Sequence, residues 1–196
     1  VLDRRVPGAE VDVVRCDSVA CGECGTESDG CQYFYAVTVA AGGSPGTPPD
    51  VVHTADGGDT WYADDIDSLG AAESASAVGC LGLYVVAVSN DSNSLHYALK
   101  SEIDDVDYDE TWVETATGFV ASGEPNDCYK CPKTGLSLFI CGDGGYIYKC
   151  VDPTVGVTVL DAGAATTEDL HAIHAVGDTV VLAGGDGGAV VYATDG

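Results

Sequence analysis

The stretch Thr54-Ala55-Asp56-Gly57-Gly58-Asp59-Thr60-Trp61, within PDVVHTADGGDTWYADDI (residues 49–66), decides the fold of this chain. A β-branched run comes before it and a Thr-Trp-Tyr run follows it, so the pattern predicts two short strands joined by a tight turn. The Asp56 carboxylate can accept hydrogen bonds from backbone N–H groups a few residues on, and the two glycines permit the positive φ angles of such a turn. Trp61 is large enough to fix the returning strand in a core.

This stretch matches the pattern Ser/Thr-x-Asp-x-Gly-x-Thr-Trp, and it therefore resembles the Asp-box (BNR) repeat. The resemblance implies that the motif caps the outer hairpin of a β-propeller blade. A Thr-Trp pair 51 residues later and an Asp at the end of the chain suggest partial copies. The structural Asp-box residues are then Thr54, Asp56, Gly58, Thr60, Trp61, Thr111, Trp112 and Asp195.

The rest of the chain repeats one order of elements: strand, Gly/Asp turn, strand, Asp-box-like turn, strand. Two GDGG turns lie 43 residues apart, at Asp143 and Asp186. Spacings of 43 and 51 residues fit the roughly 40–50 residues of a four-stranded propeller blade. The sequence therefore predicts an all-β fold, a β-propeller of four-stranded antiparallel blades, with a β-sandwich as the alternative.

The expected propeller covers residues 11–196, with blades at about 11–66, 70–117, 120–163 and 165–196, the last of them incomplete. Residues 1–10 are an N-terminal segment or a strand that closes the ring. The sequence stops inside a box-like motif, and we therefore expect the chain to be part of a longer propeller.

Charge and hydropathy exclude several classes of partner. The 196 residues contain 7 Lys and Arg against 32 Asp and Glu, a formal net charge of −25. Binding to nucleic acid or to anionic lipid requires a basic surface. No apolar run approaches the ~20 residues of a membrane helix, so we expect no membrane insertion.

The nine cysteines suggest cross-links or a metal. Eight of them form candidate sets for disulfides or for a structural zinc ion: Cys16, Cys21, Cys24, Cys31, Cys128, Cys131, Cys141 and Cys150. Disulfides are favoured, and Cys141 and Cys150 are expected to face each other across a hairpin. Zinc bound by four thiolates is the alternative. The C-x4-C-x2-C spacing also occurs in plant-type ferredoxins, but there the fourth ligand lies far downstream, not six residues away, and the surrounding loop does not match.

An acidic loop offers a second candidate metal site. Asp105, Asp107 and Asp109 resemble the first half of a calcium loop, but Glu110 and Ala116 stand where an EF-hand needs Gly and Glu. A Ca²⁺ site on this loop and a solvated acidic loop both remain open. His171 and His174 lie on opposite faces of an expected strand, which argues against a shared metal. No cofactor is expected beyond a structural Zn or Ca ion.

Asp-boxes also occur in sialidases, and Arg5-Val6-Pro7 resembles the Arg-Ile/Leu-Pro motif of those enzymes. Sialidase chemistry needs three separated arginines that hold the substrate carboxylate. The arginines here are confined to the first fifteen residues, so the sequence predicts no sialidase triad. A hydrolase of neutral glycans that uses two carboxylates stays open, but the spacing singles out no pair.

The GDGG-x-Ile-Tyr turn also resembles photosynthesis-assembly-factor-like and sortilin-like repeats. Such propellers are mostly rigid scaffolds that present loops to a partner. The leading hypothesis is a non-enzymatic structural or binding module of an extracellular assembly, such as a phage or virion tail or capsid surface, with other protein subunits as partners in an oligomer. The alternatives are a propeller that binds or hydrolyses glycans and an assembly factor for a protein complex.

Overall fold

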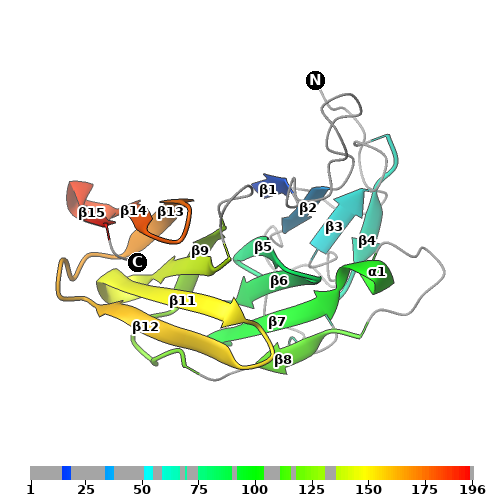
Figure 1. Ribbon diagram of the computed structural model, residues 1–196, viewed down its shortest axis with the longest axis horizontal. Coiled ribbons are helices and arrows are strands. Elements are labelled where there is room, and N and C mark those ends of the chain that lie inside the picture. Colours follow the sequence, from blue (N-terminus) through cyan, green and yellow to red (C-terminus); the bar gives the residue numbers. More distant parts are fainter. Residues whose placement is uncertain are drawn as a thin grey trace, which may run out of the picture.

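The computed structural model describes residues 15–18, 34–37, 51–54, 59–66, 69, 75–89, 92–103, 111–115, 118–130 and 136–194. The expected N-terminal segment, residues 1–10, lies outside these ranges. The described residues form four antiparallel sheets that follow one another along the chain (Figure 1).

The first sheet consists of β1 (Arg15–Ser18), β2 (Phe34–Val37), β3 (Val51–Thr54) and β4 (Tyr62–Asp64). The second consists of β5 (Ala77–Leu81), β6 (Tyr84–Ser89), β7 (Ser94–Leu99) and β8 (Val113–Thr115), with a short helix α1 (Lys100–Ile103) between its last two strands. The third consists of β9 (Pro125–Tyr129), β10 (Leu138–Gly142), β11 (Tyr146–Asp152) and β12 (Gly156–Ala162). The fourth has three strands, β13 (Leu170–Val176), β14 (Val180–Gly185) and β15 (Val190–Ala193).

Every sheet has its strands in sequence order, so each strand is hydrogen-bonded to its neighbours in the chain. Tight turns explain this meander, because Gly82 in the β5–β6 turn and Gly177 in the β13–β14 turn both have positive φ. The single-turn 3-10 helices at Asp143–Gly145 and Asp186–Gly188 occupy the same place in the third and fourth sheets. They are the two GDGG turns.

The middle sheets are buried on both faces, which distinguishes blades from the layers of a sandwich. Three apolar clusters lie between successive sheets, and we call them the first, second and third interfaces. The first joins Val37 to Val85, the second joins Val86 to Ile140, and the third joins Phe139 to Ile173. Since Phe139 and Ile140 are consecutive on β10, their side chains point to opposite faces of the sheet. Figure 1 shows the sheets succeeding one another from β1–β4 to β13–β15.

The prediction of an all-β chain built from antiparallel four-stranded blades, with an incomplete last one, is confirmed. The apolar content supports the burial on both faces: β6 is Tyr-Val-Val-Ala-Val-Ser, and only its first residue is partly exposed. The last sheet instead alternates, because β13 buries Leu170, Ile173 and Ala175 and exposes the residues between them. Among the described residues, no helix combines the length and hydrophobicity needed to cross a membrane.

Candidate functional site

The GDGG turn of the third sheet lies against the fourth sheet, and glycine is what permits this contact. Gly145 has φ +78°, and a Cβ atom placed on it would lie 1.9 Å from the Thr166 carbonyl oxygen. Gly144, with φ +62°, donates its backbone N–H to a carboxylate oxygen of Asp169 at 2.8 Å. The turn therefore requires glycine for backbone conformation and for close approach of the next blade.

Polar side chains of β9 complete this junction. Asn126 donates from Nδ2 to the Asp143 carboxylate at 2.7 Å and to the Leu170 carbonyl oxygen of the next sheet at 3.1 Å. The Asp127 carboxylate accepts from the Ile173 backbone N–H at 3.0 Å. The carboxylate of Asp127 and the amide of Asn126 are thus engaged in hydrogen bonds that join one blade to the next. These contacts hold the two blades together.

A second junction connects the turn between β13 and β14 with the start of β10. The Asp178 carboxylate accepts from the backbone N–H groups of Leu136, at 2.9 Å, and Ser137, at 2.8 Å. The backbone of Leu136 is fixed in this way, yet its side chain is 78% exposed. Leu136 therefore exposes a large apolar side chain to solvent while hydrogen bonds fix its backbone.

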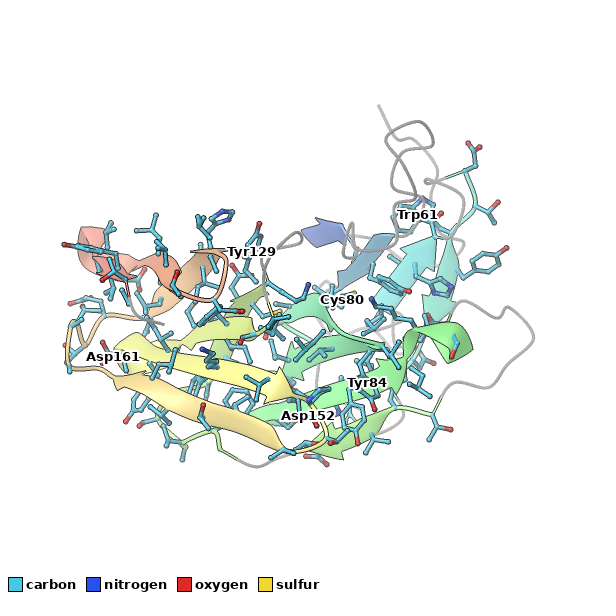
Figure 2. The ribbon with its side chains drawn as sticks, viewed as in Figure 1. Trp61, Cys80, Tyr84, Tyr129, Asp152 and Asp161 are labelled. Atoms are coloured by element: carbon cyan, nitrogen blue, oxygen red, sulfur yellow. The ribbon has the colours of Figure 1, made fainter. Side chains whose placement is uncertain are left out.

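The Asp-box stretch spans the connection from the third to the fourth strand of the first sheet. Thr54 is buried at the end of β3, whereas Thr60 is exposed and Trp61 is partly exposed just before β4 (Figure 2). Thr111 and Trp112 precede β8, the fourth strand of the second sheet, and Trp112 is buried in the first interface. Asp56, Gly58 and Asp195 lie outside the described residues.

The corresponding turn of the third sheet, between β11 and β12, has an aspartate, Asp152, although the rest of the Asp-box pattern is missing there. The Asp152 carboxylate accepts hydrogen bonds from the side-chain hydroxyl of Thr154 at 2.7 Å and from its backbone N–H at 2.9 Å. These bonds lower the pKa of Asp152 below its ordinary value. Figure 2 places Asp152 where the β11–β12 hairpin turns.

A buried histidine–carboxylate pair is the site that sequence reasoning missed. His53 on β3 and Asp64 on β4 are both buried, and the His53 Nδ1 atom lies 2.6 Å from the Asp64 carboxylate. Tyr35 and Tyr62 stack against the imidazole ring with centroid distances of 5.9 and 5.3 Å. The ring stacking follows from the strand register, which places His53 opposite Tyr35 on β2 and opposite Tyr62 on β4.

The second sheet carries another buried histidine that the sequence did not single out. The His96 Nε2 atom lies 2.6 Å from the Ser94 hydroxyl, which is also bonded to Ser92. The described residues contain no group of three or more His, Cys, Asp or Glu side chains arranged to hold a metal ion. The observed polar contacts of the two imidazoles are thus with Asp64 for His53 and with Ser94 for His96.

The expected facing of Cys141 and Cys150 is wrong. In the β10–β11 register Cys141 pairs with Ile147, while Cys150 pairs with Leu138. Cys141 packs in the third interface and Cys150 in the second, so the two thiols point to opposite faces of one sheet. Among the described cysteines no disulfide is seen: Cys80, Cys128, Cys141 and Cys150 are buried thiols. Burial raises the pKa of Cys150 to about 12, which makes it a packing residue.

The remaining candidate ligands fall largely outside the description. Cys16 lies on β1, with its side chain outside the description. Cys21, Cys24, Cys31, Cys131 and the acidic loop of Asp105, Asp107 and Asp109 lie in ranges that the structure does not describe. The zinc and calcium sites stay predictions. His171 and His174 have separate neighbours, since His171 lies 3.1 Å from Asp186 and His174 contacts the Tyr129 ring.

Comparison with known proteins defines the class from the fold. No protein-family model matches this chain, and no curated protein matches it significantly. Solved structures do match, and with the sheets described above they define a β-propeller.

Two of the similar structures are of YCF48. One, YCF48 from Cyanidioschyzon merolae, has a TM-score of 0.53 and 15% identity, covering 84% of this chain and 51% of that chain. Another, YCF48 bound to D1 peptide, has a TM-score of 0.48 and 12% identity, covering 96% of this chain and 71% of that chain. This chain thus spans about half the length of the first structure, and the likeness concerns the fold alone.

Proposed function

We propose that this chain is a non-enzymatic β-propeller scaffold that binds a polypeptide partner, in the manner of an assembly factor. The observation that carries the proposal is the display of Leu136. Its backbone is held by Asp178 across two sheets while its side chain stands in solvent. An exposed apolar side chain that is already positioned loses little conformational entropy when a partner covers it.

Other exposed apolar side chains stand at turns of neighbouring hairpins. Leu83 lies in the β5–β6 turn and Val155 in the β11–β12 turn, and both are largely exposed. The acidic and amide groups of the third interface are engaged in joining blades. What the described part of the molecule offers a partner is therefore a rigid body with apolar turns. The resemblance of the GDGG-x-Ile-Tyr turn to assembly-factor repeats supports the same proposal.

The charge of the chain specifies the chemistry of the partner segment. A net charge of −25 repels acidic polypeptides and attracts basic ones. We propose an extended segment that combines apolar residues with Lys or Arg. Binding of such a segment should weaken as salt rises, because the Debye length falls from about 30 Å at 0.01 M to about 8 Å at 0.15 M.

A peptide array tests the proposal. Basic–apolar peptides should bind the wild-type chain, and Leu136→Asp should reduce their affinity at least about tenfold, the equivalent of ~1.4 kcal/mol. Leu160→Asp is the matched control, since it introduces the same charge at an exposed leucine on β12. If no peptide binds, or if both variants bind equally well, the proposal fails.

The wider setting is proposed on the sequence alone. The acidic, cysteine-rich composition suits an extracellular or virion-surface assembly, and light scattering of the purified protein would detect the expected oligomer. The glycan alternatives stay predictions for a glycan array and a glycosidase panel.

A further inference from the structure

The last sheet has one apolar face in solvent. We call this surface the terminal face; it comprises the exposed side chains of Val176, Val180, Leu182, Val190 and Tyr192. The opposite face of the same sheet is buried in the third interface through Leu170, Ile173 and Val191. Figure 1 shows the fourth sheet at the end of the series of sheets, with β15 as its outer strand.

Two positions of the terminal face, Leu182 and Val190, correspond to positions that are covered in the third sheet. The GDGG turns align the two sheets with a shift of 43 residues, which equates Leu182 with Phe139 and Val190 with Ile147. Phe139 and Ile147 are 0% and 5% exposed because the fourth sheet covers them, whereas Leu182 and Val190 are 48% and 68% exposed. The registers agree, since Cys141 pairs with Ile147 as Gly184 pairs with Val190.

The glycines of the turns repeat the same relation. Gly145 and Gly188 share a φ of +78°, but a Cβ on Gly145 would meet the Thr166 carbonyl oxygen in the connection from β12 to β13. A Cβ on Gly188 would meet no atom within 4 Å. The space beside the last turn is therefore open where, at the third sheet's turn, the segment leading into the next sheet fills it.

The polar junction is repeated as well. In the strand pairing, Pro125 lies opposite Gly142 as Leu170 lies opposite Gly185, so the next residues, Asn126 and His171, are equivalent. The His171 imidazole contacts Asp186 as Asn126 contacts Asp143. In the third interface Asn126 also reaches the Leu170 carbonyl oxygen of the next sheet. The His171 side chain is about half exposed.

We infer that the terminal face is a blade–blade interface, and that its occupant is a further propeller blade. Continuity with the third interface defines the chemistry of that occupant. It presents apolar side chains on the facing side, a backbone carbonyl above Gly188 and a carboxylate before its innermost strand, as Thr166 and Asp169 do for the third sheet. This inference does not depend on the proposed function.

The first sheet of a second copy does not offer a matching surface. The first sheet would have to use the face that carries Ala36, Val52 and Thr54, but these residues are buried within the chain itself. The first sheet therefore does not supply the blade that covers the terminal face.

The test appends a blade to the full chain. A second copy of residues 164–194, which already covers such a face in the third interface, is joined after residue 196, and hydrogen–deuterium exchange is measured. We expect the amides of β14 and β15 to exchange at least roughly tenfold more slowly than in the unextended chain. Leu182→Asp in the original blade should abolish this protection, and Leu160→Asp, at a leucine that is 44% exposed on β12, should leave it intact.

Three outcomes would overturn the inference. One is unchanged exchange in β14 and β15 of the extended chain. Another is an appended segment whose amides exchange as fast as those of an unfolded peptide, since docking is what should order it. The third is a discrete dimer of the unextended chain, measured by light scattering, that Leu182→Asp dissociates, because a second copy would then be the occupant.

Discussion

The two GDGG turns provide a matched pair of positions, Gly145 and Gly188, at which the same substitution should have different effects. Both have φ +78°, so an alanine at either is strained by about 1–2 kcal/mol, offset by ~0.4–1 kcal/mol because alanine restricts the unfolded chain. At Gly188 no atom lies within 4 Å of the new Cβ, so Gly188→Ala should cost about 1 kcal/mol or less.

Gly145→Ala carries the same strain and a collision between blades. Its Cβ would lie 1.9 Å from the Thr166 carbonyl oxygen, and that oxygen cannot retreat without moving the strand that follows it. Overpacking of this kind costs about 1–3 kcal/mol beyond the strain. Gly145→Ala should therefore be less stable than Gly188→Ala by about 2 kcal/mol, or ~4–8 °C in Tm for a chain of this length.

Urea denaturation of the two variants, followed by far-UV circular dichroism, measures this difference. The slopes should agree, so that the midpoints report stability alone. Equal losses at the two positions would refute the reasoning, because the third sheet's turn would then not lie under the fourth sheet.

Three further predictions concern the junctions and buried groups. Asn126→Ala should lower the free energy of unfolding by about 1–3 kcal/mol, measured in urea, because it removes the donor to Asp143 and to the Leu170 carbonyl; an unchanged midpoint would contradict this. Alkali should destabilise the fold between about pH 9 and 12, because burial raises the pKa values of Tyr148 and Cys150 to about 12, above the ordinary 10.0 and 9.0, so the unfolded chain loses these protons first. Stability should be fully present below pH 9, and Cys150→Ala should flatten the decline; an equally steep decline in that variant would count against it. Iodoacetamide without reductant should label the described thiols only after denaturation, and labelling that requires a reductant would show disulfides at Cys80, Cys128, Cys141 or Cys150.

The sequence predicted the features that depend on local pattern. Alternating strands and Gly/Asp turns recur at fixed spacing, so the four sheets and the GDGG turns could be expected from neighbouring residues alone. The strand expected to carry His171 and His174 is present as β13, Leu170–Val176. The position of Thr111-Trp112 before a fourth strand follows from the same repeat.

The blade junctions could not be predicted, because they join residues far apart in the chain. Asn126 and Leu170 are 44 residues apart, and Leu136 and Asp178 are 42 apart, so only the packed sheets bring them together. The prediction that Cys141 faces Cys150 is wrong for a similar reason. A change of one residue in the register of two strands exchanges the faces on which their side chains lie, and the sequence does not determine the register. The His53–Asp64 contact likewise depends on the pairing of β3 with β4.

The central claim is that the sheets are successive blades, with the two middle sheets covered by a neighbour on both faces, and β10 is where one measurement can test it. Nuclear Overhauser effects from the Phe139 ring and from the Ile140 methyl groups report the two faces of this strand. We expect contacts from Phe139 to Ile173 of the fourth sheet and from Ile140 to Val86 of the second, which are members of separate clusters. Contacts from only one of the two side chains, with the other in solvent, would indicate a sandwich layer and would contradict the propeller.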